Sequence, residues 1–113
     1  MAKSNKPIVW SLFAAGGTLA AFLAPVLVLL FLLAALGRAP AVLHYSQLHA
    51  VAAHWFGKLF LFAVIALFLW HAAHRLRVTL HDFGLRQDAI VAVIVYVVAA
   101  AGTLLSVLYV LRI

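Results

Sequence analysis

Residues 7–36 read PIVWSLFAAGGTLAAFLAPVLVLLFLLAAL, a stretch without a single Lys, Arg, Asp or Glu. A helix rises about 1.5 Å per residue, so this run exceeds the roughly 30 Å needed to cross the hydrocarbon core of a bilayer. Pro25 is expected to kink the helix. Gly37 suits the left-handed cap position, and Pro40 cannot continue a helix. The stretch therefore predicts a tilted, kinked transmembrane helix over about residues 8–36.

Two further apolar runs predict two more helices that cross the membrane. The second helix is expected to begin near Ser46 and end near Asp82 with Gly84 as its terminating residue, and its membrane-crossing part is expected at about 55–76. The polar segment at about 44–54 is expected to lie in the membrane interface. A third span is predicted at about 89–111, with Asp88 as its N-terminal cap. The prediction is an all-α integral membrane protein in which residues 1–113 form one anchor domain with three transmembrane helices.

The composition supports this class and excludes others. Hydrophobic residues make up 69% of the chain and charged residues only 9%, far below the roughly 25% charged residues of soluble domains. The net charge of +6 comes from Lys and Arg at the ends of apolar runs, where they contact lipid headgroups, so we expect membrane lipids and no nucleic acid as partners. The chain has no cysteine, so it cannot supply a disulfide or an iron–sulfur ligand.

The distribution of basic residues predicts the orientation. Three spans place the N-terminus and the second loop on the same side of the membrane. That side carries five basic residues (Lys3, Lys6, Arg75, Arg77 and Arg86), whereas the other side carries three (Arg38, Lys58 and Arg112). Loops rich in Lys and Arg remain in the cytoplasm. We therefore expect the N-terminus in the cytoplasm and the chain in the cell inner membrane as a multi-pass protein.

Small residues predict where the helices pack closely. The first span carries Gly17/Ala21 and Ala20/Ala24 at a spacing of four, and the third span carries a run of small residues at 99–102. Such surfaces let helix backbones approach each other in lipid. Three helices enclose little volume, so some of these faces are expected to meet another subunit.

Polar side chains at the cytoplasmic end of the spans form the candidate site. Trp10 stands at the start of the first span, and His74-Arg75 at the end of the second, so both are expected at similar depth. His71, His74 and His81 share one helical face. Histidine can donate to a carbonyl oxygen or relay a proton, and arginine can stabilise negative charge on a quinone oxygen. The cluster therefore favours a quinone site with an apolar slot and a polar mouth.

Simpler interpretations of the same residues stay open. Trp10 is also typical of an interfacial anchor, and the arginines are typical of topology and headgroup contacts. All six histidines lie on or just before the second helix, so a haem would need its opposing ligand from a partner subunit. His71 is the best-placed candidate for such a ligand.

Several motifs follow one another along the chain: PIVWSLFAAGG at 7–17, Ala24-Pro25-Val26, GKLFLF at 57–62, Leu69-Trp70, His74-Arg75 and His81-Asp82. In their combination and order, over nearly its whole length, the chain resembles the family of fumarate reductase D subunits. The stretch RLRVTL at 75–80 departs from relatives that carry further histidines there, which argues against an extended histidine chain for protons.

This resemblance implies a role in a four-subunit quinol:fumarate oxidoreductase. Such a chain attaches a flavoprotein subunit and an iron–sulfur subunit to the membrane together with a C subunit, and FAD and the iron–sulfur clusters belong to those partners. The residues that the resemblance assigns to the menaquinol-binding site are Trp10, Phe13, Gly17, His74 and Arg75. It implies no haem, no metal site and no catalytic residue in this chain, which is a non-catalytic subunit of an enzyme complex in anaerobic electron transfer.

Three alternatives define other functions. A small transporter needs an intramembrane carboxylate for coupling, and the only two acidic residues, Asp82 and Asp88, fall in the predicted turn. A purely structural anchor leaves the quinone site to its partners. An anchor of the succinate dehydrogenase type carries haem b and shows its absorption spectrum.

Overall fold

The structure, a computed structural model, describes residues 6–113 and is helical almost throughout. Three long helices, α1 (Lys6–Ala35), α3 (Trp55–Asp82) and α4 (Asp88–Arg112), are long and apolar enough to cross a membrane. A short 3-10 helix η1 (Ala41–Leu43) and the helix α2 (Tyr45–Ala53) connect α1 to α3. The predicted all-α architecture with three spans is confirmed. Lys3, one of the basic residues assigned to the N-terminal side, lies outside the described residues.

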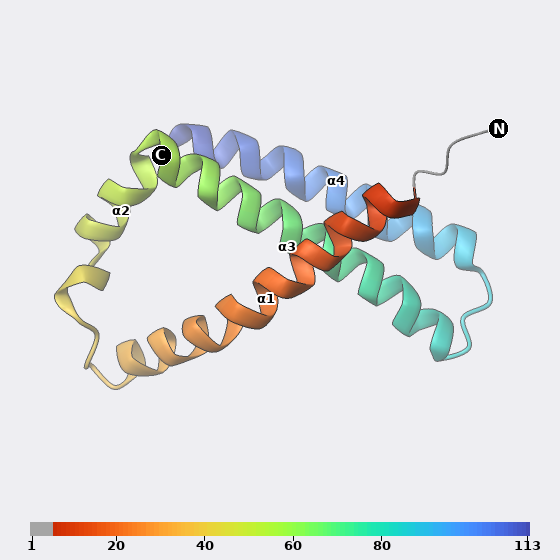
Figure 1. The fold of residues 1–113 in the computed structure, drawn as a ribbon, viewed down its shortest axis with the longest axis horizontal. Coiled ribbons are helices and arrows are strands. Elements are labelled where there is room, and N and C mark those ends of the chain that lie inside the picture. The colour runs from red at the N-terminus through yellow and green to blue at the C-terminus, as the bar shows by residue number, and fades with distance from the viewer. Residues whose placement is uncertain (1–5) are drawn as a thin grey trace.

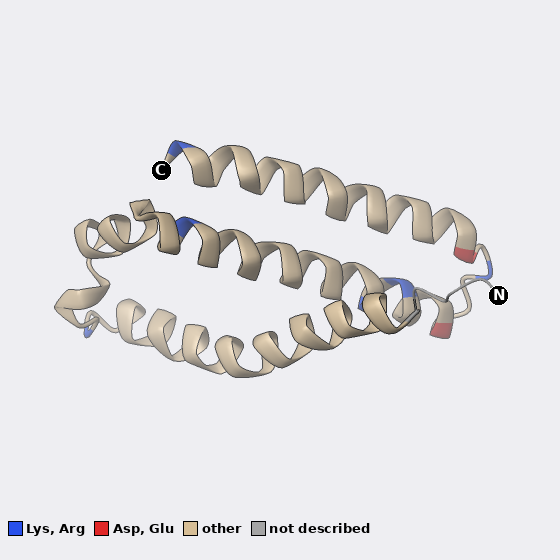
Figure 2. Cartoon of the chain, turned by 45° about the horizontal axis from the view of Figure 1, so that its top comes forward, with Lys and Arg blue, Asp and Glu red and all other residues tan. Residues whose placement is uncertain are grey.

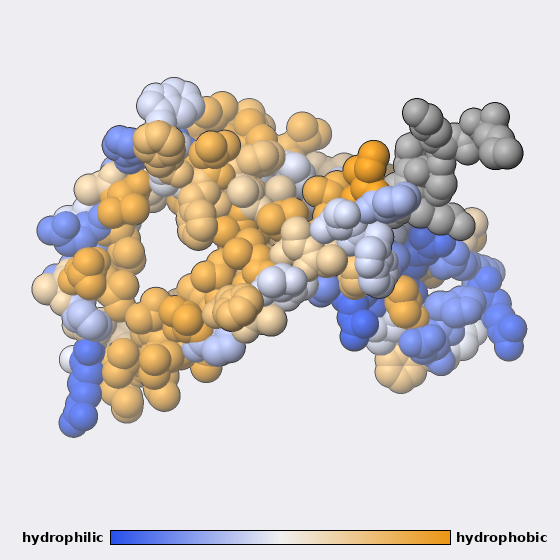
Figure 3. Space-filling model, viewed as in Figure 1, coloured by the Kyte–Doolittle hydropathy of each residue, from blue (hydrophilic) through white to orange (hydrophobic). Residues whose placement is uncertain are grey.

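The helices form an open arrangement rather than a closed bundle (Figure 1). α3 and α4 run antiparallel and make the most extensive contact, whereas α1 crosses α3 and makes no contact of similar extent with α4. The C-terminal half of α1 diverges from α3, and the space-filling view shows an opening between them that is bordered by apolar side chains (Figure 3). Only four apolar residues of the described chain are buried: Ala73, Val95, Ala99 and Val110. The core thus lies almost entirely in the α3–α4 seam.

Small residues set the two helix contacts, although not all those predicted. At the α1–α3 crossing, an added Cβ on Gly16 would lie 2.6 Å from the carbonyl oxygen of Leu67. In the α3–α4 seam, Ala99 is only 2% exposed, and a Cβ on Gly102 would lie 3.0 Å from Leu69. Ala21 and Ala24 are exposed in the single chain. The crossing therefore rests on Gly16 and on Gly17, which is one member of the predicted pairs.

Two glycines end the long helices with the same motif. Gly37 and Gly84 have φ of +68° and +95°, values at which a side chain would be strained. After α1, Gly37 N–H donates to Ala34 and Arg38 N–H to Leu33; after α3, Gly84 N–H donates to His81 and Leu85 N–H to Leu80. These are paired Schellman bonds that satisfy the last carbonyl groups of each helix. The predicted role of both glycines is confirmed.

Two local expectations turn out differently. The helix predicted from Ser46 to Asp82 is broken at His54, whose ψ of 146° separates α2 from α3 and whose Nδ1 accepts from Phe56 N–H. α1 continues as one helix through Pro25 and follows a bowed path (Figure 2), and the kink expected at Pro25 stays a prediction. Asp88 does not cap α4, because an arginine of α3 engages its carboxylate. The cap residue is Gln87, which makes no side-chain cap bond.

The two ends of the molecule carry different sets of polar residues. The beginning of α1 and the turn between α3 and α4 lie at one end of the molecule, and α2 and the C-terminus lie at the other (Figure 1). Both acidic residues lie at the first end (Figure 2). The candidate site is built at this same end.

Candidate functional site

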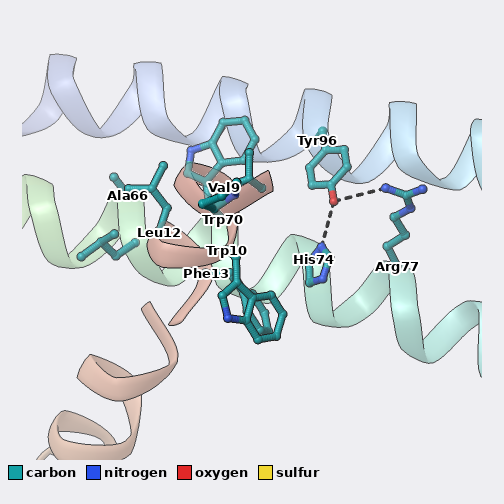
Figure 4. Close-up of a pocket in the computed structure, with 11 residues that line it drawn as sticks. Val9, Trp10, Leu12, Phe13, Ala66, Trp70, His74, Arg77 and Tyr96 are labelled. Carbon is teal, nitrogen blue, oxygen red and sulfur yellow. Dashed lines mark hydrogen bonds between the residues drawn. The ribbon is translucent and has the colours of Figure 1, made fainter. Parts of the chain in front are cut away.

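An open groove of about 1370 Å³ lies where the first turns of α1 cross α3 (Figure 4). Its lining is mostly apolar and comes from all three long helices: Pro7, Val9, Trp10, Leu12, Phe13, Ala66, Leu67, Trp70, His74, Arg77 and Tyr96. Its few polar groups come mainly from α3 and α4. The groove thus combines an apolar wall with a small polar end.

Four rings pack together where α1 meets α3. Phe13 stacks on His71 with ring centroids 4.5 Å apart and meets His74 edge-on at 4.6 Å. Trp10 lies 5.3 Å from Phe13 and is 63% exposed, so a broad indole face is left uncovered. Pairs in this range of separation are stabilising beyond their buried area. Phe13 therefore joins the tryptophan on one helix to both histidines on the other.

A hydrogen-bonded chain leads from His74 to the α3–α4 turn (Figure 4). His74 Nδ1 lies 3.1 Å from the Tyr96 hydroxyl, and Arg77 Nη1 donates to the same hydroxyl over 3.5 Å. Arg77 Nε donates to Asp88 Oδ1 at 2.8 Å, and its Nη2 donates to Oδ2. This two-pronged geometry matches the planar guanidinium to the carboxylate. Asp88 therefore holds Arg77 in place, and Arg77 in turn reaches the tyrosine that contacts His74.

Trp70 fixes the ring of Tyr96. The two rings are stacked 6.0 Å apart, and the indole N–H of Trp70 donates to Thr103 Oγ1 at 3.1 Å. The Thr103 hydroxyl donates to the Ala99 carbonyl at 2.8 Å. The guanidinium of Arg77 also lies over the Tyr96 ring, 5.8 Å from its centroid. Tyr96 is thus held by both its ring and its hydroxyl.

His71 is engaged differently from His74, one turn along the same helix. Its Nδ1 lies 3.0 Å from the Phe13 carbonyl oxygen, and since a carbonyl can only accept, Nδ1 carries the proton. The ring packs against Gly17, where an added Cβ would lie 2.7 Å from His71 Cε1. His71 therefore ties α1 to α3 through a bond to the backbone. Across residues 6–113, no three His, Asp or Glu side chains converge into a group that could hold a metal ion.

The structure brings together most of the residues singled out from the sequence. Trp10, Phe13 and His74 line the groove, and Gly17 lies beside it against His71. Arg75 is exposed and does not line the groove. His81 is likewise exposed, so the shared helical face of the three histidines does not extend the site that far.

Three lining residues that carry polar groups were not among those assigned to the menaquinol-binding site: Trp70, Arg77 and Tyr96. Tyr96 is a polar side chain well inside an apolar span, a pattern that indicates a needed hydrogen-bond partner, and His74 is that partner. Trp70 stands four residues before His74, one turn away on the helix. Nothing in the sequence distinguishes Arg77 from Arg75, because either can turn toward α4 or toward the outside.

The groove fits a flat, apolar ring that carries oxygen atoms. Trp10 and Phe13 offer faces for stacking, and Leu12, Ala66 and Leu67 extend the apolar wall. His74 and Tyr96 place hydrogen-bonding atoms at one end, beside the positive charge of Arg77. An apolar groove with few convergent polar groups is the usual form of a small-molecule site.

Comparison with known proteins places the whole chain in one family. The sequence model of the fumarate reductase D subunits matches residues 1–111. The fumarate reductase D subunit of Vibrio parahaemolyticus serotype O3:K6 (strain RIMD 2210633) is 37% identical over 98% of this chain and 90% of its own length. The proteins of the same name from Aliivibrio fischeri (strain MJ11) and Shewanella sp. (strain W3-18-1) are each 34% identical, over 98% and 97% of this chain and 94% and 93% of their own lengths. This chain belongs to the family of fumarate reductase D subunits.

Proposed function

We propose that this chain contributes one wall of a menaquinol-binding site in a fumarate reductase complex, with Trp10, Phe13 and His74 in contact with the quinol ring. The observation that carries the proposal is the groove in which an exposed indole, a phenyl ring and a hydrogen-bonded imidazole from two helices face one apolar space. Family membership independently supports a membrane subunit of this enzyme complex.

The residues have distinct parts in this proposal. Trp10 and Phe13 bind the flat ring by stacking, and the apolar side chains beside them exclude water from one face. His74 makes the hydrogen bond that orients an oxygen of the ring. Gly17 acts indirectly, because its lack of a side chain lets the His71 ring lie against α1. A bound menaquinol supplies two electrons and two protons when it is oxidised.

The remaining walls come from other subunits in this proposal. The groove is open, and the apolar surface of α1 includes Phe22 at 74% and Phe31 at 73% exposure. In a multi-pass protein of the inner membrane, such a surface faces either lipid or another membrane helix. We assign part of it to the C subunit, and the polar end of the groove to contact with the iron–sulfur subunit that joins the flavoprotein to the membrane. Arg75, which is exposed at this end, is then available to the same interface.

The test compares two activities of the purified complex with His74→Ala or Trp10→Phe in this chain. Quinol-dependent fumarate reduction is expected to fall about 10-fold or more for His74→Ala, since a partly buried hydrogen-bonding group is lost, and less for Trp10→Phe. Fumarate reduction by a soluble artificial donor, which bypasses the membrane site, is expected to remain unchanged.

Matched controls lie at the opposite end of the molecule. His49→Ala and Trp55→Phe remove the same groups from exposed positions on α2 and at the start of α3. Both are expected to leave the two activities unchanged. If quinol oxidation survives in His74→Ala and Trp10→Phe as it does in these controls, the chain is a structural anchor and the proposal is wrong.

A further inference from the structure

Tyr96 is the centre of a hydrogen-bonded chain that runs from Asp88 through Arg77 to His74. Contact between His74 and a quinol does not by itself require this chain. Its hydroxyl has one proton to donate and contacts two groups, Arg77 Nη1 and His74 Nδ1. An arginine carries five N–H donors and no acceptor. The contact with Arg77 can therefore form only with Arg77 as donor and the Tyr96 oxygen as acceptor.

This constraint determines the direction of the second bond. The hydroxyl proton of Tyr96 needs an acceptor, and the only one it contacts among the described residues is His74 Nδ1. If Nδ1 carried a proton instead, the hydroxyl would receive two donors and its own proton would lack a partner at a partly buried position, which is unfavourable. The arrangement thus favours a neutral His74 with Nδ1 as acceptor and the proton on Nε2.

We propose that Asp88, Arg77 and Tyr96 are positioning residues that fix His74 in its Nε2–H tautomer. Asp88 orients Arg77 through two bonds, Arg77 sets the direction of the Tyr96 hydroxyl, and Tyr96 sets the protonated nitrogen of His74. His71 holds the opposite tautomer, because its Nδ1 donates to the Phe13 carbonyl. Two histidines one turn apart on α3 therefore carry their protons on different ring nitrogens.

The tautomer limits what His74 can do, and this part rests on the quinol site proposed above. A neutral imidazole with its proton on Nε2 offers a donor at that nitrogen. His74 then recognises a lone pair on a ring oxygen and holds the ring in place. It is not the first acceptor of a quinol proton, because Nε2 has no lone pair available for that proton. The first acceptor must be a group of another subunit or water.

The decisive measurement is nitrogen NMR of the complex in lipid nanodiscs, with histidines labelled by ¹⁵N. Protonated and unprotonated ring nitrogens resonate in separate regions of the spectrum, and the His74 signals are those lost in His74→Asn. We expect the His74 pair to show the Nε2–H tautomer and the His71 pair, identified with His71→Asn, to show the Nδ1–H tautomer. An Nδ1–H tautomer of His74 would overturn the proposal.

Two variants test whether the chain causes the tautomer. Tyr96→Phe removes the hydroxyl, and Arg77→Met leaves the hydroxyl but frees it to accept from His74. Both are expected to produce a mixture of His74 tautomers, whereas Tyr109→Phe on the same helix, 64% exposed, is expected to leave the signals unchanged. His74 signals that stay as a single Nε2–H tautomer in both variants would also overturn the proposal. The use of two variants guards against one of them failing to assemble.

Kinetics separates this inference from the proposed function. In Tyr96→Phe only part of the His74 population presents its donor, so the KM for quinol is expected to rise about 2- to 10-fold with a smaller change in kcat. If the KM is unchanged although the His74 tautomers are mixed, the His74 donor does not contact quinol. That result contradicts the proposed function but leaves the tautomer assignment intact. An NMR result against the tautomer contradicts the positioning chain even if His74→Ala abolishes quinol oxidation.

Discussion

Arg77 and Asp88 illustrate at the level of single residues how a charged pair is accommodated near a membrane boundary. Their side chains are 33% and 39% exposed, so solvent reduces the strength of the pair, but the two-pronged contact adds geometric specificity. The pair links the last turns of α3 to the first residue of α4, directly across the turn that joins them. It therefore stabilises the helical hairpin as well as the orientation of Tyr96.

A double-mutant cycle measures this link. Arg77→Gln and Asp88→Asn are each expected to destabilise the chain to a similar, small extent, because each removes the same pair of bonds. The double variant is expected to be no less stable than either single variant, since the interaction is lost only once. Unfolding by SDS in mixed micelles provides the measurement. Additive losses would show that the two residues act independently.

The sequence predicted part of the site at this scale, and the reason for the rest is geometric. Trp10 and His74 were predicted because topology alone sets their depth in the membrane. The choice between Arg75 and Arg77 depends on the rotation of α3 about its axis, which only the packing against α4 determines. Asp88 was predicted as a helix cap from its position in the sequence. In the structure it pairs with Arg77, eleven positions earlier, and this contact too depends on how α3 packs against α4.

At the level of elements, the crossing of α1 over α3 brings the two backbones closest at Gly16. A Cβ at position 16 would meet the Leu67 carbonyl oxygen at 2.6 Å and His71 Cβ at 2.9 Å, and neither atom belongs to the flexible end of a side chain. The helices must therefore separate to admit even a methyl group. The His71 bond to the Phe13 carbonyl and the aromatic wall of the groove both depend on this close approach.

Gly16→Ala is accordingly expected to destabilise the chain by about 1–3 kcal/mol and to weaken quinol oxidation, because overpacking displaces α1. Gly102→Ala is the matched control: its Cβ would approach only the movable Leu69 side chain, with Cδ1 at 3.0 Å, and alanine is the better helix former. The SDS unfolding curves of the two variants give the comparison. Equal stability of Gly16→Ala and Gly102→Ala would show that the crossing tolerates a side chain.

The corner between α2 and α3 was not predicted from the sequence. Hydropathy and helix propensity continue across His54, so a single long helix was expected, and a local pattern cannot report the packing that breaks it. The packing involves Gly57, where a Cβ would lie 1.9 Å from the Val51 carbonyl oxygen. The backbone of α2 therefore folds onto α3 at a point where only a glycine fits.

Gly57→Ala is expected to open this corner and to increase the distance between α2 and α3. The chain has no native cysteine, so spin labels can be attached specifically at Gln47→Cys and Phe60→Cys, both exposed positions. Pulsed EPR is expected to give a longer mean distance in Gly57→Ala and an unchanged distance in Gly102→Ala. An unchanged distance in Gly57→Ala would mean that the corner adapts in another way.

At the level of the whole molecule, the fold is an incomplete unit that needs neighbours. Its extents are 53 × 30 × 22 Å, and among the described residues only the seam between α3 and α4 contains a buried core. The sequence predicted this well, because three spans of high apolarity without a wide enclosed interior indicate a subunit of a larger membrane assembly. The crossing angle of α1 and the opening beside it were not predictable, since they depend on contacts between distant small residues.

The orientation of the molecule is the last property that the charge distribution predicts. The end with the candidate site carries the start of α1 and the α3–α4 turn, where Arg77 is paired and Arg75 and Arg86 are exposed. Basic side chains that remain near headgroups favour the cytoplasmic side. If the quinol site is to pass electrons to an iron–sulfur subunit in the cytoplasm, the groove must also open on that side. Two independent arguments thus predict the same orientation.

Single cysteines test this orientation directly. In intact spheroplasts, Val42→Cys in η1, which is 68% exposed, is expected to react with a membrane-impermeant maleimide. Gln87→Cys in the α3–α4 turn is expected to react only after the membrane is broken. Because the chain itself contains no cysteine, each signal reports one position. The reverse pattern would place the groove outside the cytoplasm, where it cannot deliver electrons to a cytoplasmic partner, and would contradict both the orientation and the proposed quinol site.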